Sequence, residues 1–110
     1  MKKTNSRIFA AATAIAVVFV LPLPTRAQSA SETLYKSKCA ACHSDGSGSA
    51  MGKTLGVHDF HTSDVQKMSD EELSGIIANG KNKMPAYGKS LKAEDIKGLV
   101  AYIRSLAPAK

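Results

Sequence analysis

The sequence predicts an all-α protein with three main helices. Two S-x-x-E segments, Ser29–Glu32 and Ser69–Glu72, have the spacing of a capping box, which marks the start of a helix. Apolar residues between positions 96 and 103 recur at i, i+3, i+4 and i+7, as expected for one buried helical face. No segment has a convincing strand pattern. Together these observations favour helices packed around one core.

Each helix has its own start and stop signals. In the second helix, Met68 and Leu73 occupy the two positions of a hydrophobic staple, and Gly80 stands where a helix commonly ends. The segment between the first two helices, residues 44–60, is rich in glycine and is expected to be a loop. A single helical turn is expected at 63–66. The three helices are expected over residues 30–42, 70–79 and 93–106.

A C-x-x-C-H pentapeptide at residues 39–43, the haem box, ends the first predicted helix. This pattern marks covalent attachment of a c-type haem. Residues three or four apart share a helix face, so Cys39 and Cys42 can both form thioether bonds to the vinyl groups of one porphyrin. The imidazole of His43 can then bind the iron from below the ring. The pentapeptide predicts one haem c per chain.

Two other readings of the cysteine pair remain open at this point. A C-x-x-C pair can be a dithiol–disulfide couple in a βαβ setting, or it can supply half of a tetrahedral zinc site. The chain contains only two cysteines, and no convincing strand follows them. We therefore favour haem attachment.

Residues 1–27 have the organisation of a secretory signal peptide. A basic start precedes an apolar run over residues 8–21, and the segment ends in small residues. The run is shorter than the roughly 20 residues that a membrane-spanning helix needs. We expect cleavage after Ala27, which leaves a domain over residues 28–110. Cleavage after Ala30 and a retained membrane anchor are the alternatives.

Most of the positive charge belongs to this signal. The whole chain has a formal net charge of +6, and removal of the four positive residues of the signal lowers it to +2. These residues are Lys2, Lys3, Arg7 and Arg26. Nucleic-acid binding needs a clustered basic face, so no nucleic-acid partner is expected. The signal predicts export to the periplasm, without stable membrane insertion after cleavage.

The ligand on the second side of the iron decides the chemistry of such a site. A Met ligand raises the reduction potential and is typical of electron carriers. Met84 follows the second helix and precedes Pro85, which favours an extended backbone that can cross a haem face. Its thioether is a soft ligand that suits reduced iron. Weaker candidates in staple or loop positions are Met51, Met68, His58 and His61.

Together, these residues resemble a small bacterial class I cytochrome c. The resemblance rests on the haem box, the Met-Pro pair at 84–85 and the final Leu-Val-Ala-Tyr-Ile-Arg-Ser-Leu segment. It implies the class I cytochrome c fold, with three helices wrapped around one covalently attached haem and with His43 and Met84 as axial ligands. Many members have a proline after the haem box whose carbonyl orients the proximal His. Residues 44–60 contain none, so the partner of the His43 ring N–H is open.

The resemblance also implies a carrier rather than an enzyme, with no catalytic residue. We expect a monomer that passes single electrons between redox proteins, such as an oxidase, a photosynthetic centre or a periplasmic dehydrogenase. The alternative is a haem enzyme or a gas or redox sensor with a labile Met84. The expected core or haem-wall residues are Tyr35, Phe60, Ile77, Tyr87, Leu99 and Ile103. The lysines expected near the exposed haem edge, where they would attract acidic partners, are Lys53, Lys81, Lys83 and Lys89.

Overall fold

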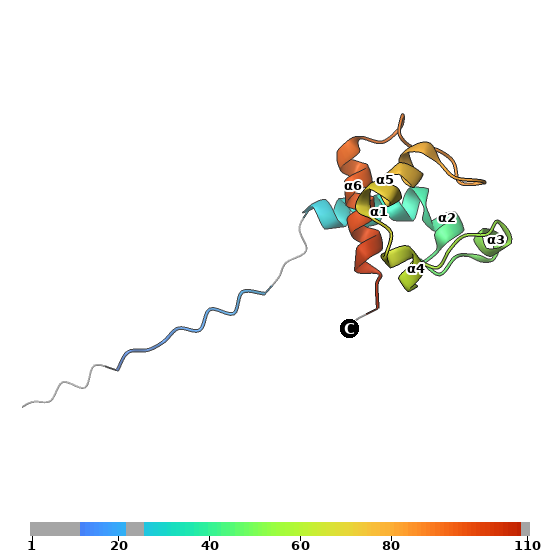
Figure 1. Cartoon of the computed structure of the whole chain (residues 1–110). Coiled ribbons are helices and arrows are strands. Elements are labelled where there is room, and N and C mark those ends of the chain that lie inside the picture. Colours follow the sequence, from blue (N-terminus) through green and yellow to red (C-terminus); the bar gives the residue numbers. More distant parts are fainter. Residues whose placement is uncertain (1–11, 22–25, 109–110) are drawn as a thin grey trace, which may run out of the picture.

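Helices make up most of the residues that the structure, a computed structural model, describes: 12–21 and 26–108. Within these residues there is no β-strand, only an isolated bridge between Lys81 and Met84. The prediction of an all-α fold is confirmed (Figure 1). The helices are α1 (Arg26–Lys38), α2 (Ala40–His43), α3 (Ala50–Thr54), α4 (Ser63–Gln66), α5 (Asp70–Asn79) and α6 (Ala93–Ser105).

Helices α5 and α6 begin where their capping residues lie. The hydroxyl of Ser69 accepts a bond from the Glu72 N–H at 3.1 Å, and the Glu72 carboxylate accepts one from the Ser69 N–H at 2.8 Å. Gly80 follows α5 with a φ of 75°. At α6, the Asp95 carboxylate accepts a bond from the Lys92 N–H at 3.0 Å. Both predicted helices are therefore confirmed to within one residue.

The first predicted helix is wrong in two respects. Helix α1 begins already at Arg26, so Ser29 is not an N-cap residue, and Glu32 instead pairs with Lys36 at 2.6 Å. The helix also breaks at Cys39, whose φ of −114° lies outside the usual α-helical range. The haem box therefore spans the junction of two helices rather than the end of one.

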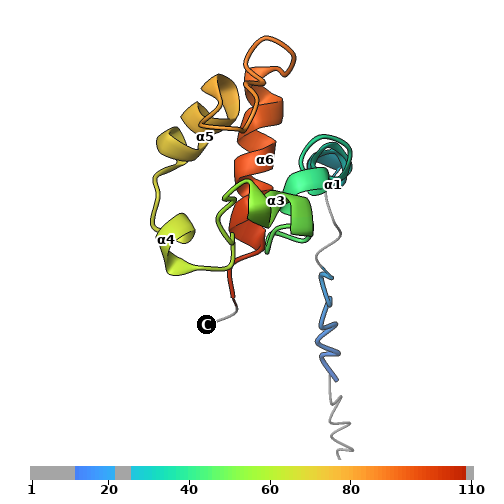
Figure 2. The same ribbon diagram turned by 90° about the vertical axis from the view of Figure 1, so that its right-hand side faces the viewer.

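Helices α1 and α6 cross at close range (Figures 1 and 2). At Gly98 of α6, an added Cβ would collide with the hydroxyl of Ser31 on α1. Next to this point the rings of Tyr35 and Tyr102 pack with their centroids 4.7 Å apart. The absence of a side chain at Gly98 thus brings the two terminal helices together.

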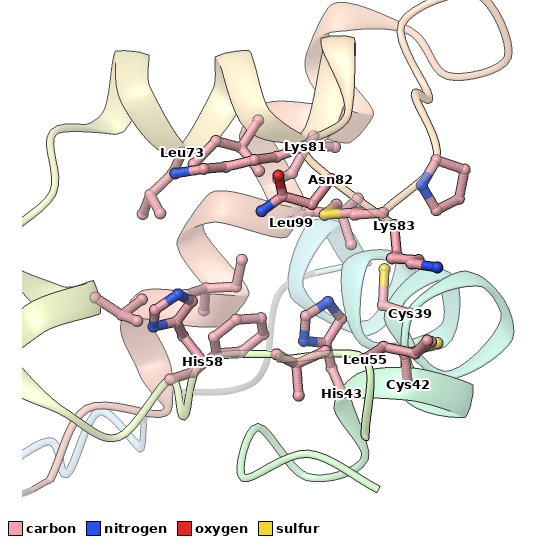
Figure 3. Close-up of a pocket in the computed structure, with 18 of the residues that line it drawn as sticks. Cys39, Cys42, His43, Leu55, His58, Leu73, Lys81, Asn82, Lys83 and Leu99 are labelled. Carbon is pink, nitrogen blue, oxygen red and sulfur yellow. The ribbon is translucent and has the colours of Figure 1, made fainter. Parts of the chain in front are cut away.

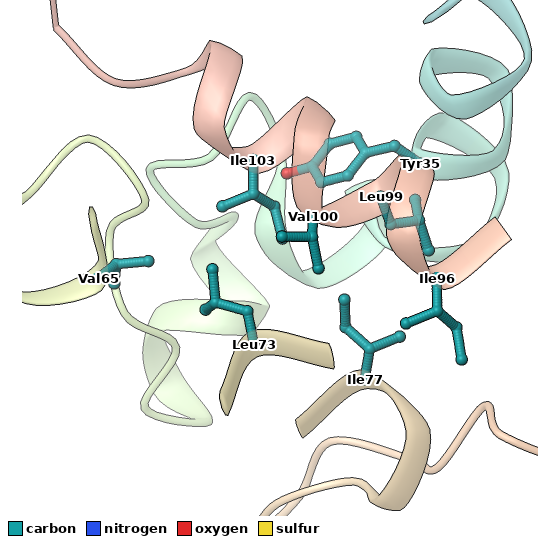
Figure 4. Packing of buried hydrophobic residues seen from close by; sticks show 8 residues of the cluster. All are labelled: Tyr35, Val65, Leu73, Ile77, Ile96, Leu99, Val100 and Ile103. Carbon is teal, nitrogen blue, oxygen red and sulfur yellow. The ribbon is translucent and has the colours of Figure 1, made fainter. Parts of the chain in front are cut away.

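The hydrophobic core lies between α1, α4, α5 and α6 (Figure 4). Leu99 is its most buried side chain, with 1% of its surface exposed. Burial of such side chains contributes about 1.5–3 kcal/mol each. Because the members come from helices far apart in sequence, the core fixes how these helices are arranged. Among the described residues, the eight buried hydrophobic side chains of the core are Tyr35, Val65, Leu73, Ile77, Ile96, Leu99, Val100 and Ile103.

The segment expected as a glycine loop contains the short helix α3. Ser49 caps it by accepting a bond from the Gly52 N–H at 3.0 Å, and its own N–H donates to the Cys42 carbonyl at 2.9 Å. A Cβ on Gly52 would clash with that carbonyl oxygen and lie 2.8 Å from its carbon. Helix α3 therefore packs directly on the backbone of the haem box, which only glycine permits.

Residues 12–21 have no regular secondary structure and extend away from the helical domain (Figure 1). Their apolar side chains are exposed, for example Ile15 at 83% and Phe19 at 86%. Residues 1–11 and 22–25, on which the rest of the predicted signal peptide falls, lie outside the described residues. Among the described residues, no helix is long and apolar enough to cross a membrane.

Gly52→Ala is predicted to destabilise the protein by about 1–3 kcal/mol, because the new methyl group overpacks the contact between α3 and the Cys42 backbone. Gly75→Ala is the matched control. A Cβ at Gly75 meets nothing within 4 Å, so alanine should be neutral or stabilise α5 by up to about 1 kcal/mol. Chemical denaturation of both variants measures the difference. Equal stabilities would contradict the packing described for α3.

Candidate haem-binding site

A pocket of about 320 Å³ opens between the haem box and the segment that follows α5. This segment, residues 80–88, is called the strap below. In Figure 3, His43, Leu55 and His58 lie on one side of the pocket, and Lys81, Asn82 and Lys83 lie on the other. The size falls in the range of about 300–1,000 Å³ typical of ligand sites. All four predicted site residues line this one pocket: Cys39, Cys42, His43 and Met84.

The haem box is fixed by its own backbone. The Cys42 and His43 N–H groups both donate to the Cys39 carbonyl, at 3.2 and 2.9 Å, so the box forms one helical turn. The chain then reverses at Ser44, whose φ is +51°. The N–H groups of Gly46 and Gly48 cap the His43 carbonyl at 2.8 and 3.0 Å. Both cysteines and the histidine therefore face the pocket from one short, rigid turn.

The His43 ring is partly buried against Phe60. The two rings stack with centroids 4.6 Å apart and planes 25° from parallel. Burial lowers the pKa of His43, which favours the neutral imidazole that binds metals. Its Nδ1 atom is buried without a hydrogen-bond partner in the protein. The structure thus holds this ring in place by stacking.

The two cysteines are half-buried and are not joined in a disulfide. Burial raises the pKa of Cys39 to about 11. A dithiol–disulfide couple normally depends on a lowered thiol pKa that yields a reactive thiolate, so this environment is unlike a redox C-x-x-C site. Both thiols line the same wall of the pocket as His43, as attachment to a single porphyrin requires.

The strap is bent back over the pocket by two residues with positive φ. Gly80 has a φ of 75°, and a Cβ there would lie 2.6 Å from the Met84 carbonyl oxygen. Asn82 has a φ of 53°, a conformation that Asn tolerates better than most residues. Lys81 and Met84 exchange backbone hydrogen bonds at 3.2 and 2.9 Å. These features place Met84 in the pocket wall.

Tyr87 ties the strap to two helices. Its N–H donates to the Ile77 carbonyl of α5 at 2.9 Å, and its hydroxyl donates to the Lys38 carbonyl at the end of α1 at 3.1 Å. The strap is therefore anchored on both sides of the pocket opening. This anchoring sets the separation between the strap and the haem box.

The alternative axial ligands divide into two groups. Met51 and His61 do not line the pocket: Met51 is 54% exposed, and His61 pairs with Asp59 at 2.7 Å. Met68 and His58 do line it, although the sequence placed Met68 in a hydrophobic staple and His58 in a loop. Met68 also packs against the core, in agreement with its expected packing role.

The prediction of the core or haem-wall residues is confirmed, since all six of them line the pocket. Of the four lysines expected near its edge, Lys81 and Lys83 line the pocket, whereas Lys53 and Lys89 do not. Sequence reasoning missed the stacking of Phe60 on His43, which no spacing in the chain indicates. It also missed several lining residues: Lys38, Leu55, Val57, Val65, Leu73, Ile76 and Asn82.

The pocket fits a covalently bound haem. Its walls are mainly apolar, it brings two thiols and an imidazole to one side, and it presents a thioether from the strap. The buried Nδ1 atom of His43 is also consistent with a ligand role, because a histidine that binds a metal through one nitrogen carries a hydrogen on the other.

Comparison with known proteins agrees with this site. The family model described as "Cytochrome C oxidase, cbb3-type, subunit III" matches residues 26–103. Cytochrome c6 of Rippkaea orientalis is 32% identical over 110 residues, which cover 99% of this chain and 97% of that protein. The solved KustC0563 c-type cytochrome has a TM-score of 0.66 at 32% identity, over 69% of this chain and 95% of its own. The chain belongs to the c-type cytochromes.

A third relative supports the same fold. Cytochrome c6 from the diatom Phaeodactylum tricornutum has a TM-score of 0.57 at 31% identity, over 73% of this chain and 93% of its own. The resemblance to small class I monohaem cytochromes c is therefore confirmed. This cytochrome carries covalently bound haem c and acts as an electron carrier.

Gly80→Ala is predicted to loosen the strap, because alanine at this positive φ costs about 1–3 kcal/mol and its methyl group would meet the Met84 carbonyl. Hydrogen exchange should become faster at the amides of Lys81 and Met84, which pair with each other. Gly75→Ala, in the same helix that leads to the strap, serves as the control and should leave these amides protected. Unchanged exchange in the Gly80 variant would show that the strap does not depend on this turn.

Proposed function

We propose that this cytochrome is a periplasmic one-electron carrier, in which Cys39 and Cys42 attach the haem and His43 and Met84 bind its iron from opposite sides. One observation carries the proposal. The four residues line a single apolar pocket, with the first three presented by the haem box and Met84 presented by the strap. A neutral imidazole and a neutral thioether are the ligand pair typical of electron-transferring haems.

The residues around the pocket suit electron transfer. When bound, the haem supplies one-electron chemistry at an iron that alternates between Fe(II) and Fe(III). Helix α2 and the strap are each fixed by backbone hydrogen bonds, so both ligands are held in place when the charge of the iron changes. Leu73, Ile77 and Leu99 exclude water from the pocket wall. We infer that the chain has no catalytic residue, because binding of the iron by both His43 and Met84 would leave no open position for a substrate.

The exposed apolar segment supports a role in export. Residues 12–21 bury none of their large apolar side chains in the helical domain, so their removal would cost the core nothing. We propose that residues 1–27 form the signal peptide and that residues 28–110 are the mature cytochrome domain. Cleavage after Ala27 would shorten α1 by two residues but would leave its contacts around Tyr35 intact.

The opening of the pocket is suited to acidic redox partners. Lys81 and Lys83 are exposed at its edge, and the apolar Leu55, 39% exposed, lies on the facing side (Figure 3). Exposed positive charges attract an acidic partner from a distance, and a small apolar contact permits brief docking. We propose that the monomer exchanges electrons here with proteins such as an oxidase, a photosynthetic centre or a periplasmic dehydrogenase.

Met84→Ala is predicted to abolish the weak far-red band of the oxidised protein, because that band arises from charge transfer between the thioether sulfur and iron(III). Met68→Ala removes a thioether from the same pocket and should keep the band. Visible absorption spectra of both variants decide the assignment. Survival of the band in the Met84 variant would contradict the proposed ligand. Rapid carbon monoxide binding by the unmodified reduced protein would favour a sensor or enzyme instead.

Electron transfer to an acidic redox protein is predicted to slow as ionic strength rises, because salt screens the attraction between the partners. Lys83→Gln should flatten this dependence, since Lys83 lies at the pocket edge. Lys89→Gln removes an equal charge from outside the pocket and should behave like the unmodified protein. Stopped-flow rates over a salt series measure both slopes. Identical slopes for the two variants would exclude docking at this edge.

A further inference from the structure

Two side-chain polar atoms of the described residues are buried without a hydrogen-bond partner in the protein. They are the hydroxyl oxygen of Tyr35 and Nδ1 of His43. Tyr35 is 2% exposed, so its hydroxyl has little access to bulk water. Buried polar groups in folded proteins are nearly always paired, and each exception calls for an explanation. Both residues line the haem pocket, so one explanation can serve for both.

The backbone places the two residues on the same side of the chain. The Cys39 N–H donates to the Tyr35 carbonyl at 2.8 Å, and the His43 N–H donates to the Cys39 carbonyl at 2.9 Å. Tyr35 and His43 are therefore separated by two successive helical turns that meet at Cys39. Residues in this relation project toward one face, despite the break between α1 and α2.

Phe60 contacts both rings. It stacks on His43 with centroids 4.6 Å apart, and it meets Tyr35 edge-on with centroids 6.5 Å apart and planes 64° from parallel. The phenol and the imidazole thus belong to one aromatic cluster on the haem-box side of the pocket.

The backbone carbonyls next to Phe60 already have donors. The Gly46 carbonyl accepts from the Phe60 N–H at 2.8 Å, and the Phe60 carbonyl accepts from Nε2 of Gln66 at 2.6 Å. Residues 44–60 contain no proline, so the proline carbonyl that orients the corresponding histidine in many class I cytochromes has no counterpart here. A different acceptor is needed for the second nitrogen of His43.

A tyrosine hydroxyl has the required chemistry. A histidine that binds a metal through one nitrogen donates its other N–H to an acceptor in nearly all cases. A phenol can accept such a bond through its oxygen while keeping its own proton. Burial raises the pKa of Tyr35, so the side chain stays a neutral phenol at physiological pH.

We propose that one buried water bridges the two groups: it accepts a hydrogen bond from the Nδ1–H of His43 and donates one to the Tyr35 hydroxyl, and so takes the place of the missing proline carbonyl. Neither atom has a partner in the protein, so the two do not bond to each other directly. This inference rests on the proposed binding of iron by Nε2 of His43. Tyr35 is then a positioning residue: it fixes which imidazole nitrogen carries the hydrogen and supports the electron donation of the ring to iron.

Tyr35→Phe in the haem-loaded protein tests the proposal, because it removes one oxygen atom and keeps the ring that packs on Phe60 and Tyr102. The midpoint potential should shift upward, since His43 loses an acceptor and stabilises iron(III) less. Tyr102→Phe is the matched control: it removes the same atom from the ring that touches Tyr35, and its potential should match the unmodified protein. An unchanged potential in the Tyr35 variant, or equal shifts in both variants, would overturn the proposal.

Proton NMR of the same proteins adds a readout that a purely structural role would not change. The Nδ1–H of His43 should exchange slowly with water in the unmodified reduced protein and faster in Tyr35→Phe. Exchange in the unmodified protein as fast as that of free imidazole would overturn the proposal without any variant. The far-red band should persist in Tyr35→Phe. If Met84 were not an axial ligand, the far-red band would already be absent from the unmodified protein. Failure of the ligand assignment can therefore be told apart from failure of the Tyr35 proposal.

Discussion

Of the eight buried hydrophobic side chains in the part of this cytochrome that the structure describes, six also line the haem pocket, so the protein core and the walls of its site are largely the same residues. A domain of this size buries a modest fraction of its surface, and a large apolar prosthetic group enlarges the core that it can form. Leu99, Ile77 and Leu73 contact the pocket from α6 and α5. The packing of the helices is therefore coupled to the contents of the pocket.

The two sides of the pocket are built by different physical means. On the haem-box side, Gly52 lets α3 lie against the Cys42 carbonyl, and Phe60 supports the His43 ring. On the strap side, the turn at Gly80 and the two hydrogen bonds of Tyr87 hold the chain across the opening. A carrier benefits from such rigidity, since small changes in ligand geometry between the two oxidation states make electron exchange fast.

Local signals in the sequence predicted the parts of the fold that depend on neighbouring residues. The capping box at Ser69 and the stop at Gly80 were visible because each acts within one helical turn. The same signal was misleading at Ser29, because α1 begins three residues earlier, at Arg26. The Glu32 carboxylate then pairs with Lys36 on the same helix instead of capping its start. The four site residues could be chosen from motif spacing. The contact of Gly52 with the Cys42 carbonyl could not, because it depends on how two segments meet in space.

Thermal unfolding of the chain with and without haem shows whether the group held in the pocket completes the hydrophobic core. The double variant Cys39→Ala/Cys42→Ala, purified without haem, can be compared with the loaded protein by circular dichroism. We expect a cooperative transition for the loaded protein and the loss of that transition, together with most of the helical signal, for the haem-free chain. A haem-free chain that melts cooperatively at the same temperature would contradict it.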